Sequence, residues 1–331
     1  MLKLHAVARI SAFLVVCAAA AGAAAQDNYP NKPIRMIVGL SPGGMADQAA
    51  RLLGPGLSKE LGRQIVVENR VGATGAIAAR MVADSAPDGY TLMMVLDGTL
   101  VLPAALNPNI PFDAVKDFAP IVKLIESPMT VVAHPSLAAN NLAELLELTR
   151  SPGGDKKYFY GSAGNGSSGH LLGEYLKQLT GLQITHVSYK GAADAARDTV
   201  GGQIPLLIAS VGTSLPFVKS GRLKGLAVTS AKRFPALPDM PTAAESGLPA
   251  LKNFNVPAWA GIVAPAGTPD SIIRRVYEAT AKVLGDGDLI EKYAGVGAVV
   301  SVAGPAQFGR QIASELEQWR KVVRQANLRS E

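Results

Sequence analysis

Cysteine is almost absent from this chain of 331 residues. Its one cysteine, Cys17, lies within an apolar N-terminal segment, so the rest of the chain has no disulfide framework, no thiol nucleophile and no thiolate ligand for a metal. Histidine is scarce too. Only His134, His170 and His186 follow that segment, with neither metal-ligand spacing nor an HExxH pattern. We therefore expect no metal and no cofactor.

Concentrated charge, aromatic side chains and long apolar runs are also in short supply. The formal net charge is +6 and aromatic residues make up 5% of the chain. No block of basic residues interleaves with aromatics, the pattern typical of nucleic-acid-binding surfaces. Beyond the N-terminal segment, no stretch approaches the roughly 20 apolar residues that a membrane-spanning helix needs. These absences argue against a nucleic-acid-binding or membrane-embedded protein.

The N-terminal segment itself is typical of a secretory signal. Lys3 and Arg9 precede an uncharged run at 10–16 that continues as small residues. A lipoprotein would use Cys17, but the valine before it is bulkier than a lipid-attachment site takes. An uncleaved anchor would need about 20 apolar residues and a different exit flank. We therefore expect residues 1–25 to be a cleaved signal peptide.

Cleavage of this leader sets the size and charge of the mature chain. Ala23 and Ala25 occupy the small-residue positions that a leader peptidase needs, which places the new N-terminus at Gln26. Loss of Lys3 and Arg9 lowers the formal net charge from +6 to +4. The remaining length exceeds that of a usual single core, so we expect an exported, weakly basic protein of two domains.

Short β-type runs alternate with amphipathic stretches along nearly the whole mature chain. Strands are predicted at 34–38, 64–68, 90–95, 129–134, 158–160, 184–189, 204–209, 223–228, 259–264 and 298–302. Helices are predicted up to about 61, and at 73–83, 141–150, 168–180, 192–201, 213–220, 270–284 and 305–327. Pro55, set between two glycines, is expected to kink or end the first helix. The alternation predicts an α/β fold with mostly parallel sheets.

Two loop-rich zones, near 127–132 and at 237–259, divide this pattern. If the chain leaves one lobe at the first zone and returns at the second, the middle segment forms a lobe of its own. We therefore assign 26–127 and 247–331 to a discontinuous domain 1 and 128–246 to domain 2, with two hinge segments and a ligand cleft between the lobes.

Two strand–turn–helix loops, in "IVGLSPGGMADQAAR" and "YFYGSAGNGSSGHLLGEYL", are the most specific local features. Gly43 and Gly44 allow the first turn to point N–H groups inward at the start of the next helix, where they form an anion site. The second loop surrounds Asn165 with glycines and serine hydroxyls. Taken alone, the first turn is explained as well by packing. Together the two loops predict a site for a small anion.

A dinucleotide site is a poor alternative for the second loop. Gly164, Gly166 and Gly169 spell GxGxxG after a strand, but the carboxylate expected about 20 positions later for the ribose is missing. No GxxxxGK[ST] pattern exists, which excludes a standard P-loop.

A secreted serine hydrolase is the enzymatic alternative. Ser167 or Ser168 would be the nucleophile, and His170 or His186 the base. The G-x-S-x-G elbow of such enzymes is absent because position 170 is histidine rather than glycine. The sequence favours binding over catalysis and leaves this alternative as a minor one.

Seven blocks of sequence carry a resemblance far more specific than any single glycine motif. In chain order they are "YPNKPIRMIVGLSPGGMADQAAR", "VENRVGATGAIAARMVADSAPDGYTLMM", "NPNIPFDAVKDFAPI", "GSAGNGSSGHLLGEYL", "HVSYKGAADAARDTVGGQI", "PTAAESGLPAL" and "WAGIVAPAGTP". Across nearly the whole mature chain they resemble the Bug receptors, the substrate-binding proteins of tripartite tricarboxylate transporters.

The resemblance implies a two-lobed periplasmic binding protein of the type II, or Venus flytrap, kind, with a mixed sheet flanked by helices in each lobe. Such a receptor is not an enzyme. It closes on a small carboxylate, whether an organic acid, a dicarboxylate or an amino-acid-like solute, and docks on the membrane subunits of the transporter. We expect a periplasmic monomer, because a closing receptor needs free lobes. A receptor that feeds a sensory system instead is not distinguished by sequence.

The resemblance also implies that backbone N–H groups and hydroxyls of the two loops hold the ligand carboxylate. Carried over by motif, the ligand-binding residues are Ser41, Pro42, Gly43, Gly44 and Asp47 from one lobe, and Ser162, Ala163, Gly164, Asn165, Gly166 and Ser167 from the other.

Four side chains near these loops keep two interpretations each. Asp97 follows a strand and either faces a ligand ammonium or, as we favour, caps the next turn. Asp47 lies in a first helical turn, where a carboxylate is favourable with or without a ligand. If it faces the ligand, an amino-acid-like solute is favoured. His170 faces the cleft or packs under the loop, and Tyr189 reaches a second carboxylate or packs internally.

Overall fold

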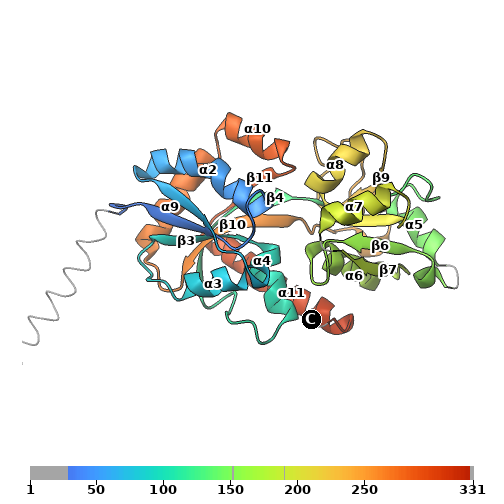
Figure 1. Ribbon diagram of the computed structural model, residues 1–331, viewed down its shortest axis with the longest axis horizontal. Coiled ribbons are helices and arrows are strands. Elements are labelled where there is room, and N and C mark those ends of the chain that lie inside the picture. Colours follow the sequence, from blue (N-terminus) through green and yellow to red (C-terminus); the bar gives the residue numbers. More distant parts are fainter. Residues whose placement is uncertain (1–28, 151–152, 190, 329–331) are drawn as a thin grey trace, which may run out of the picture.

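The computed structural model describes residues 29–150, 153–189 and 191–328. Within them the chain forms two sheets that lie side by side, each covered by helices on both faces (Figure 1). We call each sheet with its helices a lobe. The predicted signal peptide at 1–25 lies outside the described residues. The two-lobed α/β fold is confirmed.

The first sheet has six strands in the order β11-β4-β10-β3-β1-β2. β1 pairs in parallel with β2 and β3, whereas β10 and β4 continue the sheet in antiparallel fashion. Its strands are β1 (Ile34–Val38), β2 (Ile65–Asn69), β3 (Thr91–Leu96), β4 (Phe118–Ser127), β10 (Ala258–Pro265) and β11 (Val299–Ala303).

The second sheet has five strands in the order β7-β6-β8-β5-β9. β6 is parallel to β7 and β8, and β5 is antiparallel to β8 and β9. Its strands are β5 (Met129–Ala133), β6 (Phe159–Ser162), β7 (Thr185–Ser188), β8 (Leu206–Ser210) and β9 (Lys224–Val228). Both sheets are mixed, so the mixed sheets implied by the family resemblance are confirmed. The prediction of mostly parallel sheets, made from the alternation of strands and helices, was wrong.

Helices sandwich both sheets because alternate strand residues point to opposite faces. The first lobe contains α2 (Met45–Leu61), η1 (Ala73–Gly75), α3 (Ala76–Ala83), α4 (Asp97–Leu106), α9 (Asp270–Val283), α10 (Gly287–Gly295) and α11 (Pro305–Gln325). The second lobe contains α5 (Leu142–Thr149), η2 (Gly154–Lys156), α6 (Ser168–Thr180), α7 (Ala192–Val200), α8 (Val211–Lys219), η3 (Ala243–Ser246) and η4 (Pro249–Leu251). In β1, for example, Met36 packs with α2 and α9, whereas Ile37 packs with α3, α4 and α11.

Helix α2 does not end at Pro55, contrary to one alternative in the sequence prediction. Leu53 and Leu57, on either side of the proline, are at most 1% exposed, and their burial favours the continuous helix. Gly56 lies against α9, where an added Cβ would meet a Val283 methyl at 2.5 Å. Gly56 therefore permits close packing of α2 against α9.

Three elements escaped the sequence prediction. Strand β4 was missed because Lys123 and Glu126 interrupt its apolar pattern, although they form an ion pair at 2.5 Å. Helix α4 is buried on most sides and so has no polar stripe, and α10 lies between glycine-rich segments. Pattern methods detect a helix by its amphipathic period, which a fully buried helix lacks.

The chain passes between the lobes in two places. β4 ends at Ser127 and β5 begins at Met129 in the other sheet, so the first crossing is short. The return leads from β9 to β10 through η3 and η4. Leu251 and Phe254 pack in the core of the second sheet before Ala258 opens β10.

Candidate functional site

The carboxyl ends of parallel strands from both sheets border a cleft between the lobes. One cavity of about 860 Å³ is lined by residues from the turn after β1, η1, α3, α4, the segment after α4 and the loop after β6, and we call it the α4 cavity. A second cavity, of about 480 Å³, lies where the start of α2 meets the start of α8. Ligands of open α/β sheets bind beyond the carboxyl ends of strands, so this cleft is the candidate site.

The carboxylate of Asp47 stabilises the turn at 39–44 through a hydrogen bond. Gly43 has a φ of 84° and donates its N–H to Asp47 Oδ2 at 2.9 Å. The same carboxylate accepts from Arg51 Nε and from the Asn69 amide. Burial alone would raise the pKa of Asp47, but hydrogen bonds from Arg51, Gly43 and Asn69 outweigh it and lower the pKa. Asp47 therefore carries its charge within the first lobe.

The loop at 162–168 uses several of its own N–H groups internally. Gly164 has a φ of 118° and donates to Ser162 Oγ at 3.3 Å. Asn165 N donates to Ser188 Oγ at 3.2 Å, and Gly166 N donates to His170 Nδ1 at 3.0 Å. No sequence pattern indicates that these N–H groups point into the lobe. Ser167 and Ser168, at the start of α6, line the α4 cavity.

Two histidine side chains form hydrogen bonds with this loop. The rings of His170 and His186 stack with centroids 4.0 Å apart. His186 Nε2 lies 2.7 Å from Ser162 Oγ, which lies 3.1 Å from Ser167 Oγ. Burial lowers the pKa of both rings, with a smaller effect from Lys177, and brings that of His186 to about 3. Both rings are therefore neutral at neutral pH and act as hydrogen-bonding supports.

The arrangement does not favour the serine hydrolase. In this loop, the serine that contacts a histidine ring is Ser162, which is fully buried. Ser167 Oγ accepts the backbone N–H of His170 at 3.3 Å as the cap of α6, and Ser168 faces Asp97. A nucleophile needs a base in contact and an open approach for the substrate. The described residues contain no such pairing of the predicted serines and histidines.

Asp97 begins α4 at the junction of the lobes. It is 7% exposed, and Ser168 from the second lobe donates to its Oδ2 at 3.5 Å. Burial, and to a lesser extent Glu315, raise the pKa of Asp97 to about 7, against hydrogen bonds from Gly98, Trp259 and Ser168. Asp97 lines a separate cavity of about 230 Å³ and does not line the α4 cavity. A contact with the ligand stays a prediction.

Tyr189 is tied to its own lobe. Its hydroxyl donates to Asp198 Oδ2 at 2.9 Å, and burial followed by Asp198 raises its pKa to about 12. The neighbouring residue 190 lies outside the described residues. Elsewhere along the described chain, no three histidine or acidic side chains are placed to hold a metal ion.

The family described as Tripartite tricarboxylate transporter family receptor matches residues 49–328, which include most of the first lobe and all of the second. The chain belongs to this family. Its members are solute-binding receptors and not enzymes. The cleft between opposed strand ends is therefore the candidate solute site.

Individual relatives cover nearly the whole receptor. Protein BugT from Bordetella pertussis is 34% identical over 321 residues, 96% of this chain and 97% of its own. The solved structure of R. palustris Rpa4515 with adipate is 32% identical, with a TM-score of 0.77 over 91% of this chain and 99% of its own. MatC from Rhodopseudomonas palustris with bound malate is 31% identical, with a TM-score of 0.73 over 89% and 100%.

The chain is therefore a Bug-type periplasmic solute-binding receptor. Receptors of this family bind small carboxylates and work with membrane components of a transporter. Over the described residues, no helix combines the length and apolar character needed to cross a bilayer.

The sequence did not indicate the wall of the α4 cavity that is formed by α3 and α4. Ile77 and Arg80 of α3 and the apolar end of α4 line it, but none was predicted to contact a ligand. Ile77 is 58% exposed, which is unusual for a large apolar side chain. The block "VGATGAIAAR" contained the signal, because Ala73 and Thr74 there have positive φ and line the cavity.

Proposed function

We propose that this receptor captures a small carboxylate in the cleft and presents it to the membrane subunits of a tripartite tricarboxylate transporter. The observation that carries the proposal is the meeting of helix N-termini from both lobes. α4 begins at Asp97 and α6 at Ser168, and these side chains are 3.5 Å apart across the lobes. Helix N-termini present N–H groups without intrahelical partners and the positive end of the helix dipole, which favour an anion.

In this proposal the carboxylate contacts the turn at 41–44 from one lobe and the loop at 163–168 from the other. Both segments are exposed or partly exposed. Asp47, His170 and Tyr189 act behind them, because each is hydrogen-bonded within its own lobe. These three side chains would set the shape of the loops rather than contact the ligand.

Closure would occur by rotation about the two crossings. We place the hinges at 127–129 and near 255–258, because Leu251 and Phe254 pack with the second sheet. The predicted domain limit at 246 then moves about ten residues later. The predicted signal peptide, cleaved after Ala25, would deliver the chain to the periplasm. We expect a monomer there, because closure requires both lobes to be free to move.

Calorimetric titration of the chain from Gln26 onward tests the proposal, with carboxylates as ligands and neutral sugars as negative controls. We expect binding of carboxylates alone. A double change, Ser167→Ala with Ser168→Ala, should weaken binding at least tenfold, because a hydrogen bond to a charged group contributes about 1.5–3 kcal/mol. The control is Ser220→Ala, at the exposed end of α8. Absence of carboxylate binding would refute the proposal.

Uptake separates transport from sensing. A strain that lacks the gene for this receptor should lose uptake of the carboxylate that binds in the titration. Normal uptake combined with lost induction of a response gene would assign the receptor to a sensory system instead.

A further inference from the structure

The α4 cavity is walled by apolar side chains. Leu40, Ile77, Leu96, Leu106 and Ile110 reach it from five different segments of the chain. Ile77 is 58% exposed in this structure, so a ligand in the cavity would remove apolar surface from water. A cavity of about 860 Å³ is large enough for a ligand with a body well beyond one carboxyl group.

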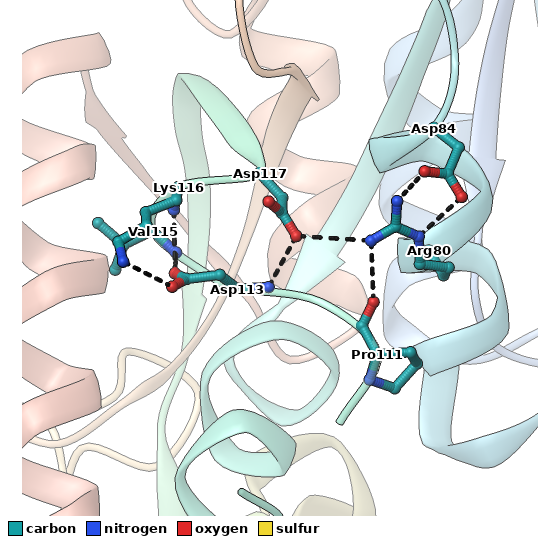
Figure 2. Close-up of polar contacts among 7 residues, drawn as sticks. All are labelled: Arg80, Asp84, Pro111, Asp113, Val115, Lys116 and Asp117. Carbon is teal, nitrogen blue, oxygen red and sulfur yellow. Dashed lines mark hydrogen bonds and ion pairs between the residues drawn. The ribbon is translucent and has the colours of Figure 1, made fainter. Parts of the chain in front are cut away.

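Arg80 is the only charged side chain among the residues that line the α4 cavity, all of which the structure describes. Its guanidinium pairs with both carboxylate oxygens of Asp84 and lies 3.9 Å from Asp117 Oδ2. It also donates to the Pro111 carbonyl at 3.2 Å. Figure 2 shows Arg80 between Asp84 on one side and Asp117 and Pro111 on the other.

The charge around Arg80 therefore does not suit a second carboxylate. Two aspartates surround one guanidinium, so the group of three side chains has a net negative charge. Asp117 is fixed in this position, because its Oδ2 also accepts the backbone N–H of Asp113 at 2.8 Å. An incoming carboxylate would have to displace an aspartate or lie beside one.

The hydroxyl groups and the helix start that suit an anion lie in the second loop. Ser167 and Ser168 line the α4 cavity at the N-terminus of α6. Gly98 lines it as well, and an added Cβ there would meet Ser168 Oγ at 3.4 Å, so the starts of α4 and α6 lie close together. The cavity thus combines one place for a carboxylate with a largely apolar wall.

We propose that the solute is a monocarboxylate with an extended apolar body, which is seated against Ile77 and the apolar end of α4. The inference rests on the proposed function, because it assigns the other end of the same ligand. A single carboxylate at the second loop leaves no second negative group beside Arg80, which already pairs with Asp84 and lies near Asp117. A short or hydroxylated acid would leave the apolar wall uncovered. A multiply charged acid would place a second carboxylate beside Arg80, where Asp84 and Asp117 already lie.

Calorimetry with matched ligands tests this. Hexanoate and adipate have the same number of carbons and differ by one carboxylate, and phenylacetate and citrate extend the comparison. We expect hexanoate to bind at least about tenfold more tightly than adipate. Tighter binding of adipate or citrate would overturn the inference and leave the proposed function standing. If no carboxylate binds, the proposed function fails together with the inference.

Two variants locate the effect in the α4 cavity. Ile77→Asn should weaken hexanoate binding about tenfold. Ile290→Asn on α10 is the matched control, because Ile290 is also exposed, at 42%, and does not line the cavity. Equal affinities of the two variants would overturn the assignment of the apolar wall.

A double change, Asp84→Asn with Asp117→Asn, releases Arg80 and should shift the preference toward adipate severalfold. Asp113→Asn is the control, because its carboxylate pairs with Lys116 rather than Arg80. An unchanged ratio of the hexanoate and adipate affinities in the double variant, with its thermal stability intact, would contradict the role given to the aspartates.

Discussion

The turn at 39–44 and the loop at 162–168 both join a parallel strand to a helix, but different groups support them. The turn depends on a charge, because Asp47 accepts from Gly43 and pairs with Arg51. The loop depends on neutral groups, since stacked His170 and His186 rings bond to it from below. Because His170 and His186 are neutral at neutral pH, they place no charge beside the loop that is proposed to bind an anion.

The two loops also differ in how tightly they are packed. An added Cβ at Gly44 would meet nothing closer than 3.5 Å, whereas one at Gly169 would lie 2.3 Å from the Ile208 carbonyl oxygen. The start of α6 is thus pressed against β8, while the start of α2 is open. Four predictions test this contrast between the loops.

Gly169→Ala should destabilise the protein by about 3 kcal/mol, because the added methyl overlaps backbone that cannot move away freely. Gly44→Ala should change the free energy of unfolding by less than about 0.5 kcal/mol. Urea unfolding of both variants measures the difference. Similar losses in the two variants would show that the loops are packed alike.

Acid should weaken the second loop before the first. The pKa of His186 is lowered to about 3 from an ordinary value of 6.5. The unfolded chain therefore takes up a proton that the folded chain refuses, and stability falls as the pH drops from about 6.5 to about 3, by up to about 1.4 kcal/mol per pH unit. Asp47, with its lowered pKa, contributes stability that is lost only at lower pH, as the folded carboxylate is protonated.

The variant His186→Asn isolates this effect, because asparagine can bond to Ser162 but does not titrate. Its free energy of unfolding, measured in urea from about pH 7 to about pH 4, should depend less on pH than that of the natural protein. Parallel profiles would assign the acid sensitivity to other groups.

Asp97, which contacts the second loop through Ser168, should have the opposite effect on how stability depends on pH. Its pKa is raised from 3.8 to about 7, so the unfolded carboxyl ionises first and stability falls as the pH rises between these values. Asp97→Asn stays neutral and should gain stability relative to the natural protein across this range. Unfolding measurements at about pH 4 and pH 7 check the sign. A constant difference between the two proteins would contradict a raised pKa.

The smallest effect concerns the caps of the two helices. Ser167 caps α6 through its side chain, whereas α2 begins at Gly44 without a side-chain cap. Ser167→Ala should cost about 1 kcal/mol, and Ser41→Ala should be neutral within about 0.5 kcal/mol. Thermal unfolding of the two variants measures this, and equal melting temperatures would contradict the contrast.

Local patterns predicted much of the fold. Helix α6 runs from Ser168 to Thr180 as predicted, and β1 has its predicted bounds. Strand β4 was missed because its two charged residues satisfy each other, Lys123 with Glu126, in a way that a hydrophobic pattern does not reveal. The mixed direction of the strands was also missed by the pattern, because alternation of strands and helices carries no direct record of strand order.

The candidate site was only partly predictable. The glycine and serine loops were visible as segments, since turn chemistry depends on neighbouring residues. The hydrogen bond from Gly166 to His170 could not be predicted, and neither could the stacking of His170 on His186. The distance between these residues along the sequence does not show that the pairing of β6 with β7 brings them together.

By itself, the sequence determined the chemical class of this protein: an α/β chain, without thiols beyond Cys17, with two anion-type loops and the blocks of a receptor family. Only the tertiary structure decided how charges were neutralised. Asp117 approaches Arg80, and Asn69 approaches Asp47, from distant parts of the chain. The physical reason is that backbone preferences act between near neighbours, whereas ion pairs and cavity walls depend on which segments the fold brings together.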